Sequence, residues 1–449
     1  MPPTKDELAR SRVLVLGLGR AGSAIARFLM KLGAAVYGHD SDQSVLAGQA
    51  VKQLRQAGMV LAPKPEVVKA DWAVVSPGIS EDNEAVVELR RRGVPVVDEL
   101  DLASQFVSGP IVAVTGSNGK STTTALIGHI LEVAGHRVFV GGNLAPGRPL
   151  SAALDVGPYD WYVVEASSFQ LERAQWFAPA VAVILNVSPD HLDRHRSLAV
   201  YAECKFRILD HQSMSDWAVL NHDDSVVMKA RGRGKADRRF FSMRRPVCGA
   251  YRSGGWLYFE GERIAPVSEM KLCGAHNVAN ALAAVCVARI VGTGVGAIRR
   301  GLAGFAGLPH RLERVRVLAG VEYVNNSMCT NPAAGIKSLE AFRRKVVLIT
   351  GGREKGLPVA DYVQAVARRA KQVILCGENA PKLGRALARA GFKRFQSAAS
   401  LVGAVRAAKA IAQAGDVVLF SPAFASFDQF RDFQERGDAF KKEVRRLKA

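Results

Sequence analysis

The segment from Ile111 to Thr123 constrains the fold more than any other part of the chain. An apolar run leads into a glycine loop and then a helical stretch, with the loop sequence Gly116-Ser117-Asn118-Gly119-Lys120-Ser121-Thr122. Strand, loop and helix in this order gather backbone N–H groups and a helix N-terminus into a cradle for phosphate. Lys120 can reach the outer phosphates, and the hydroxyl of Ser121 or Thr122 can bind Mg²⁺. An ordinary glycine turn is the alternative, but the lysine and the hydroxyls in register favour a phosphate loop, with ATP as its nucleotide.

The strand-and-helix rhythm continues before this loop. At 449 residues the chain is too long for one ordinary hydrophobic core, so we expect several domains. The predicted strands of the first part lie at 13–16, 35–37, 72–75 and 94–97, with a helical stretch ending at Leu32. Together they indicate a small, doubly wound α/β domain over residues 1–107.

Two further α/β series follow the first. The central series has predicted strands at 111–115, 161–165 and 180–187, a β-rich excursion over 249–264 and an Ala-rich helix over 279–290. A Gly and Pro break at 307–309 opens the last series, with strands at 346–350, 373–376 and 417–420. We therefore expect an α/β protein of three domains, over residues 1–107, 108–309 and 310–449.

Composition predicts a cytoplasmic protein without membrane insertion. The chain is 48% hydrophobic and 23% charged, and no apolar run approaches the roughly 20 residues that span a bilayer. The first residues, Met1 to Arg12, are polar and charged, unlike a signal peptide. Six scattered cysteines contain no C-x-x-C pair, which indicates reduced packing residues rather than a disulfide framework or thiolate metal site.

The net charge of +20 raises nucleic acid as a partner. The basic residues are dispersed, however, without interleaved aromatic residues, and their groups lie at 90–92, 231–245, 343–345, 368–369 and 441–448. A basic surface that attracts polyphosphate substrates explains the same charge. We therefore predict no nucleic-acid partner.

The first glycine turn carries a weaker signal. Gly17, Gly19 and Gly22 form a G-x-G-x-x-G pattern, and Asp40 ends the next predicted strand. This spacing occurs in dinucleotide-binding domains, which makes an NAD-dependent enzyme the rival interpretation. No separate set of residues for hydride transfer accompanies it.

Six motifs, in order along nearly the whole chain, carry a family resemblance. They are Gly116 to Thr122, Glu165-Ala166-Ser167-Ser168-Phe169-Gln170-Leu171, Asn186 with Asp190-His191-Leu192-Asp193, Gly274-Ala275-His276-Asn277, Leu308-Pro309-His310-Arg311, and Ser421-Pro422-Ala423 through Ser426-Phe427-Asp428-Gln429-Phe430. In this order they resemble the UDP-N-acetylmuramoyl-alanine:glutamate ligase family of Mur-type ligases, which performs the second amino-acid addition in peptidoglycan synthesis. The last motif favours the glutamate-adding branch.

The resemblance implies a Rossmann-like N-terminal domain for the UDP group, a central phosphate-loop ATPase domain and a Rossmann-like C-terminal domain for the amino acid. It implies an ATP-dependent amide ligase, expected as a monomer, that joins D-glutamate to UDP-N-acetylmuramoyl-L-alanine through an acyl-phosphate. These are small-molecule substrates. It reassigns the first glycine turn to the UDP-linked substrate, with the contacts Gly19, Asp40, Gly78, Asn143 and Ser168.

The resemblance also implies the catalytic and nucleotide residues. Lys120, His310 and Arg311 would neutralise the phosphates, while Asn277, Arg311 and Asn326 would contact ATP. Ser121, Thr122, Glu165 and His191 would serve Mg²⁺. Read without the resemblance, Lys205 is a plain helix-surface lysine; with it, Lys205 becomes a carbamylated residue that helps to hold a second Mg²⁺.

The glutamate site is expected in the last domain, at Thr330, Lys355, Ser426 and Phe433. Ser426 has a second interpretation as the N-cap of a helix opening at Phe427. One stretch departs from the family: where Asp-Ser-Lys-Ala-Thr-Asn is common, this chain has Asn326-Ser327-Met328-Cys329-Thr330-Asn331. An acidic nucleotide contact is thereby replaced by an amide, and a nearby cation by a thioether.

The alternatives that stay open come from three classes. A related ligase could use L-glutamate or another acceptor, and a folylpolyglutamate synthase would not need the first domain. A DNA-binding protein and a catalytically inactive homologue are the readings without ligase activity.

Overall fold

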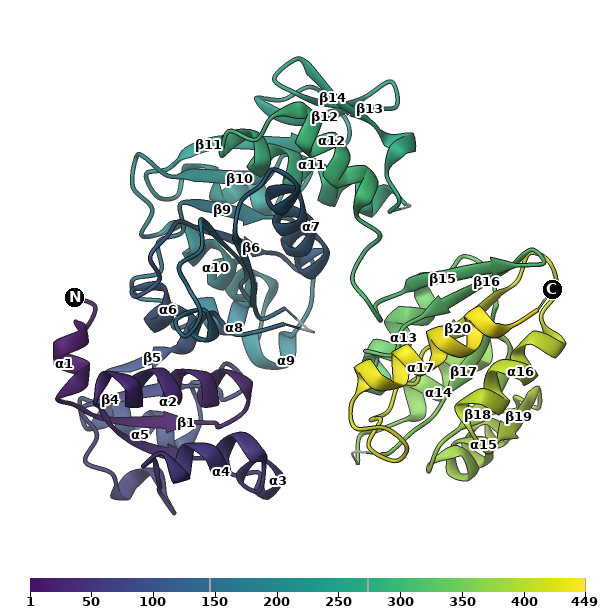
Figure 1. Cartoon of the computed structure of the whole chain (residues 1–449), viewed down its shortest axis with the longest axis horizontal. Helices are drawn as coiled ribbons and strands as arrows, with labels where there is room; N and C mark the ends of the chain where they lie inside the picture. The colour runs from purple at the N-terminus through teal and green to yellow at the C-terminus, as the bar shows by residue number, and fades with distance from the viewer. Residues whose placement is uncertain (145–146, 273, 355, 449) are drawn as a thin grey trace. The chain divides into compact units, whose positions relative to one another are not determined.

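The computed structural model describes residues 1–144, 147–272, 274–354 and 356–448. It divides into two compact units, Met1–Ala306 and Gly307–Ala449. The first unit contains sheets of five and nine strands, and the second a sheet of six strands (Figure 1). Most neighbouring strands are parallel, so the predicted α/β class is confirmed. Among the described residues no helix is long and apolar enough to cross a bilayer.

The first sheet is wholly parallel, in the order β3-β2-β1-β4-β5. Its strands are β1 (Arg12–Leu16), β2 (Ala35–His39), β3 (Val60–Leu61), β4 (Trp72–Val75) and β5 (Val96–Asp98). The helices are α1 (Lys5–Ala9), α2 (Arg20–Leu32), α3 (Gln43–Leu46), α4 (Gln49–Gln56), α5 (Glu84–Arg91) and α6 (Glu99–Ser104). Buried apolar residues form a core on each face of this sheet, which is why its strands read as apolar runs.

The second sheet has the order β14-β13-β12-β11-β10-β9-β6-β8-β7, with β6 near its middle. Its strands are β6 (Ile111–Thr115), β7 (Val138–Gly142), β8 (Trp161–Glu165), β9 (Val181–Ile184), β10 (Trp217–Asn221), β11 (Asp237–Ser242), β12 (Gly249–Ser253), β13 (Trp256–Phe259) and β14 (Glu262–Pro266). The last two pairings are antiparallel, so the predicted β excursion is confirmed as an edge extension of the sheet.

Helices cover both faces of the second sheet. One face packs on α7 (Lys120–Val133), α11 (Ala275–Ile290) and α12 (Val295–Gly304), which lie together in Figure 1. The other face has its own core, with α8 (Ser168–Leu171), α9 (Leu192–His195) and α10 (Leu198–Phe206) on that side. Short 3₁₀ helices of the unit are η1 (Pro65–Val67), η2 (Leu150–Ala153), η3 (Arg207–Leu209), η4 (Val227–Gly232) and η5 (Val267–Glu269).

The sheet of the second unit has the order β15-β16-β20-β17-β18-β19 and one antiparallel pair, β15 with β16. Its strands are β15 (Glu313–Leu318), β16 (Val321–Asn325), β17 (Val346–Thr350), β18 (Ala370–Cys376), β19 (Phe395–Ala398) and β20 (Val417–Phe420). The helices are α13 (Pro332–Glu340), α14 (Ala360–Arg369), α15 (Ala380–Arg389), α16 (Leu401–Ile411) and α17 (Phe433–Arg446).

One predicted strand is shorter than its apolar run. The run at 180–187 forms strand only over Val181–Ile184. Beyond it, Leu185 still bonds the end of β6, but Asn186 turns toward the glycine loop and bonds that instead. The residues after the strand therefore hold the loop rather than extend the sheet.

Candidate active site

The glycine loop between β6 and α7 has the backbone that a phosphate cradle needs. Gly116 and Gly119 have φ values of +150° and +84°, which favour glycine. A Cβ on Gly119 would also lie 2.3 Å from Oδ1 of Asn280. Asn186 fixes the loop from the other side: its carbonyl accepts from the Ser117 amide at 2.9 Å, and its Oδ1 accepts from the Asn118 amide at 2.8 Å. The loop is thus held in one shape at the N-terminus of α7, where helices bind anions.

Lys120 lies inside this loop. Its Nζ donates to the carbonyl of Gly116 at 2.9 Å and to that of Ser117 at 3.2 Å. Asn277, on the first turn of α11, reaches the same region indirectly, because its Oδ1 accepts from Asn280 Nδ2 at 3.2 Å. Asn280 is the residue that packs against Gly119.

Three predicted site residues meet at the end of β8. The buried carboxylate of Glu165 accepts from Ser121 Oγ at 2.6 Å and from Asn143 Nδ2 at 3.2 Å. Thr122 follows Ser121 at the half-buried start of α7. Hydroxyl and carboxylate oxygens are the ligands that Mg²⁺ prefers, so this donor set fits the ion.

Lys205 is not a surface lysine. Its side chain on α10 is fully buried, and its Nζ donates to the carbonyl of Gly116 at 2.9 Å, beside Lys120. It lies 4.3 Å above the ring of Tyr201. Burial, and then the charge of Lys120, lower the pKa of Lys205 to about 7. The buried site therefore disfavours the charged form of this amine.

His191 lies in the loop before α9, with a φ of +53° and a half-exposed ring. The ring packs edge-on against Phe169 at 5.0 Å and lies 6.4 Å from the ring of Tyr201. The Tyr201 hydroxyl in turn accepts from Ser117 Oγ at 3.3 Å, so His191 approaches the phosphate loop from the α9 side.

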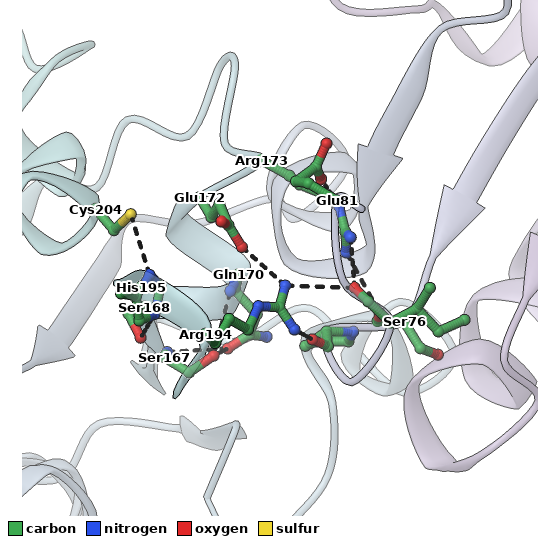
Figure 2. A network of polar contacts seen from close by, with 12 residues as sticks. Ser76, Glu81, Ser167, Ser168, Gln170, Glu172, Arg173, Arg194, His195 and Cys204 are labelled. Atoms are coloured by element: carbon green, nitrogen blue, oxygen red, sulfur yellow. Dashed lines mark hydrogen bonds and ion pairs between the residues drawn. The ribbon is translucent and has the colours of Figure 1, made fainter. Parts of the chain in front are cut away.

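Ser168 faces a buried network that the sequence did not predict (Figure 2). Its Oγ lies 3.0 Å from His195 Nε2, and His195 Nδ1 lies 3.7 Å from Cys204 Sγ. Oxygen atoms of Glu172 complete a group within 4.8 Å. The Glu172 carboxylate is already paired with Arg194 at 2.8 Å, and burial raises the pKa of the Cys204 thiol to about 11. Glu172, His195 and Cys204 thus form a buried polar network in which Glu172 is already engaged by an arginine.

A cleft of about 590 Å³ opens beside the first glycine turn, within the usual size range of ligand pockets. Asp40 lines it and fixes the turn, because its carboxylate accepts from the Leu18 amide at 2.7 Å. A Cβ placed on Gly19 or Gly78 would meet no described atom within 4 Å, so both positions border open space. Gly19 is also the N-cap of α2.

In the second unit, His310 is buried with a φ of +64°. Asn325 Nδ2 lies 3.1 Å from its Nδ1, and a Cβ on Gly437 would collide with the ring. Burial, and then the charge of Lys441, lower the pKa of His310. The neighbouring Arg311 is exposed.

Asn326 is also buried, at 5% exposure, and its side chain bonds within its own unit. Its Nδ2 donates to Ser338 Oγ at 2.6 Å and Ser421 Oγ at 3.2 Å, and its Oδ1 accepts from the Leu312 amide at 3.1 Å. The substitution for the family's aspartate therefore sits in a hydrogen-bond network that crosses the unit's core.

The structure brings part of the predicted glutamate site together. Thr330 lines a small pocket with Arg353, Glu354 and Phe424, while Lys355 lies outside the described residues. Ser426 is buried. The interpretation of Ser426 as the N-cap of a helix opening at Phe427 is wrong, because the next helix, α17, begins at Phe433 and has Asp432 as its N-cap. Phe433 binds the loop that carries Ser327, because the carbonyl of Phe433 accepts from Ser327 Oγ at 2.8 Å.

Arg436 was not predicted. Its buried guanidinium donates to the carbonyl of Ser327 at 2.9 Å and to that of Phe424 at 3.0 Å. It thereby ties the loop that carries Thr330 to the segment that carries Ser426. One arginine among the many charged residues of α17 gives no signal in the sequence.

The nine-stranded, mostly parallel sheet carries a phosphate loop at the end of a central strand, and a carboxylate and two lysines lie at this loop. This arrangement defines a nucleotide-binding α/β enzyme. Family models match the chain in three stretches: the Mur ligase MurD-like N-terminal domain over residues 11–98, the Mur ligase middle domain over 114–288, and the Mur ligase glutamate ligase domain over 310–424.

Full-length relatives and solved structures agree with these matches. The chain is 42% identical to the UDP-N-acetylmuramoylalanine–D-glutamate ligase of Pelotomaculum thermopropionicum, covering 98% of this chain and 99% of that protein. A protein of the same name from Myxococcus xanthus is also 42% identical, with the same coverage. In fold, the chain is similar to UDP-N-acetylmuramate-alanine ligase MurC from Thermotoga maritima (TM-score 0.55, 20% identity, 97% and 99% covered). It is also similar to MurF from Acinetobacter baumannii (0.56, 17%, 91% of each). The chain therefore belongs to the Mur ligase family.

Proposed function

We propose that this chain is an ATP-dependent ligase that adds D-glutamate to UDP-N-acetylmuramoyl-L-alanine in peptidoglycan synthesis. The observation that carries the proposal is the gathering of Lys120, Ser121, Glu165 and Lys205 around one phosphate loop. Its substrates follow from the full-length relatives, whose names specify D-glutamate. ATP and these precursors are small molecules of the cytoplasm, where we expect the enzyme to act as a monomer, since one chain carries every proposed site residue.

The chemistry explains why these residue types are needed. A carboxylate is a poor electrophile, so its oxygen first attacks the γ-phosphorus of ATP, which expels ADP and leaves an acyl-phosphate. The amine of D-glutamate then attacks the acyl carbon, and phosphate departs with one carboxylate oxygen. Lys120 offsets the negative charge that gathers when a triphosphate meets a carboxylate, and we assign His310 and Arg311 to the same task.

Ser121, Thr122 and Glu165 would hold Mg²⁺, which supplies charge neutralisation at the phosphates. We further propose that Lys205 is carbamylated, since its amine is buried at the loop and a carbamate would turn a cation into an anionic oxygen ligand. His191 would serve the same ion from the α9 side.

The remaining assignments divide the substrates over the proposed domains 1–107, 108–309 and 310–449. The cleft beside Gly19, Asp40 and Gly78 would take the UDP group. Asn143 and Ser168 would lie along the path of the muramyl part, and Asn277 and Asn326 on the nucleotide side. Thr330, Lys355, Ser426 and Phe433 would surround D-glutamate.

A phosphate-release panel tests the proposed function. Purified enzyme is given ATP, Mg²⁺ and UDP-N-acetylmuramoyl-L-alanine together with D-glutamate, L-glutamate, D-aspartate or lysine. We expect release only with D-glutamate, and none when the UDP substrate is omitted. Release with L-glutamate alone would move the chain to another ligase branch, and release without any amino acid would contradict amide formation.

A further inference from the structure

Two arginines of the central part of the chain donate hydrogen bonds to one loop of the N-terminal part. The loop, residues 76–81, follows β4 and contains Gly78. Arg173 follows α8 and Arg194 lies in α9. Both residues therefore belong to the part of the chain that forms the nine-stranded sheet and its phosphate loop. We refer to Arg173 and Arg194 as the arginine clamp; Figure 2 shows both side chains directed at the loop.

Arg173 is the buried half of the clamp. Its side chain has no exposed surface. It donates to the carboxylate of Glu81 and to the carbonyl of Ile79, and it lies 3.4 Å from the carbonyl of Ser76. Glu81 is held a second time by Arg90 of α5, at 2.8 Å.

Arg194 is the half nearer the phosphate site. Its guanidinium donates to the carbonyls of Pro77 at 3.2 Å and Ile79 at 3.3 Å, while Glu172 pairs with it at 2.8 Å. It also stacks over the ring of Phe169 at 4.3 Å. Because both arginines bind backbone carbonyls of the loop, they fix the path of its chain and not only one side chain.

The gripped loop is part of the UDP cleft. Ile79 lines the cleft of about 590 Å³, and Ser76 Oγ donates to the carbonyl of Gly17 in the glycine turn at 2.9 Å. A shift of the loop would therefore move a wall of the cleft and its contact with the turn at the same time.

The clamp also joins this wall to the phosphate side. Arg194 follows His191 by one helical turn, and the carbonyl of His191 accepts from the Arg194 amide at 3.1 Å. The ring of Phe169 packs against His191 and under Arg194. The short helix α9 thus carries the cleft contact, and the residue directly before the helix, His191, is a proposed metal residue.

We propose that the arginine clamp is a positioning device that sets the distance from the UDP cleft to the phosphate loop, so that the carboxylate of the bound precursor reaches the γ-phosphorus. This inference rests on the proposed function. Phosphoryl transfer requires reacting atoms about 3 Å apart, and a misplacement of about 1 Å can lower the rate by about 100-fold. An interface that only had to be stable would not need the fully buried guanidinium group of Arg173, since an apolar side chain serves as well.

The first test is a comparison of kcat and KM. Arg194→Leu should lower kcat by about 10-fold or more, with Kd for the UDP precursor and KM for ATP changed by less than about threefold. Arg194→Lys should recover part of the rate, because an ammonium can reach one carbonyl but cannot bind two carbonyls at once as the planar guanidinium does. Arg90→Leu is the matched control: it removes another partner of Glu81 without touching the central sheet, and kcat should stay within about twofold. Rates are scored per folded enzyme, below the melting temperature of each variant.

The second test needs no turnover. Hydrogen exchange is followed with and without UDP, which should protect the α9 amides of wild type and Arg90→Leu but not of Arg194→Leu. If Arg194→Leu keeps kcat within twofold and UDP still protects α9, the clamp is only structural and the inference is wrong. A wild-type enzyme that releases no phosphate with D-glutamate would instead defeat the proposed function, while the exchange result would still be readable. Arg173→Lys serves as the second clamp variant, with a smaller fall in kcat expected.

Discussion

At the scale of single residues, Lys205 shows what a sequence cannot reveal. It occupies an ordinary position in a nine-residue helix, and only packing against the glycine loop shows that its amine is buried. The fully buried amine next to a second lysine is unfavourable as a cation, which favours the neutral amine, the form that can react with CO₂ to give the proposed carbamate. Family resemblance indicated this role, and the burial gives it a physical reason.

We expect Lys205→Ala to lose activity by about 100-fold or more, because the site would lack an anionic ligand. A short carboxylic acid such as formate should restore part of the rate by occupying the vacated space. The measurement is phosphate release with increasing formate, and the exposed Lys235→Ala is the control. Full activity of Lys205→Ala would show that the lysine has no part in the reaction.

We predict that replacing Asn326 by the aspartate that is common in the family lowers the stability of the folded protein. Ser338 Oγ donates its proton to the carbonyl of Ala334 at 2.6 Å, so it can only accept from Asn326 Nδ2. In Asn326→Asp two acceptors would face each other in the core, which we expect to cost about 1–3 kcal/mol of unfolding free energy. Denaturant unfolding measures this cost, with the half-buried Met328→Lys as the neighbouring control. Unchanged stability in Asn326→Asp would show that the network rearranges freely.

At the scale of elements, most of the central strands could be predicted because they are buried on both faces. The runs at 72–75, 111–115, 161–165, 346–350 and 417–420 became β4, β6, β8, β17 and β20 without change of bounds. The failures are residues whose role comes from distant contacts. Ser426 precedes a turn rather than a helix, and the arginine clamp and Arg436 bind carbonyls far away in sequence. No local pattern records such contacts.

Helix α6 gives a prediction about pH. Burial raises the pKa of Glu99 from the usual value near 4.5 to about 7, although its carboxylate accepts from the Ser151 amide. The folded state therefore holds a proton that the unfolded state releases, and this stabilisation is present below pH 4.5 and lost as pH rises through about 7. Burial also raises the pKa of Asp98 and of Asp101, which act in the same direction.

Glu99→Gln removes the buried charge without changing the shape of the side chain. We expect it to raise the melting temperature at pH 8 and to have little effect at pH 5, so that the pH slope becomes shallower. Melting curves over pH 5–8 give the answer, with the exposed Glu132→Gln as a control. Equal slopes in wild type and Glu99→Gln would mean that this carboxyl is not protonated in the folded state.

At the scale of the whole molecule, the proposed function assigns the parts of one reaction to three sheets. The phosphate loop lies at the end of a central strand of the nine-stranded sheet, and the cleft proposed for UDP lies at the carboxyl ends of the five-stranded sheet. Such ends are where ligands bind in parallel α/β sheets. The rhythm of strands in the sequence predicted three α/β series, and the structure contains three sheets; D-glutamate is named by the full-length relatives.

The most direct test follows an oxygen atom. UDP-N-acetylmuramoyl-L-alanine labelled with ¹⁸O in its carboxylate is incubated with ATP and D-glutamate, and the phosphate and the UDP product are analysed by mass spectrometry. An acyl-phosphate requires that each new amide bond releases one phosphate containing one carboxylate oxygen. We therefore predict one ¹⁸O atom per phosphate, in equal amount to the D-glutamate adduct. Phosphate without the label, or ATP consumption without the adduct, would contradict the account.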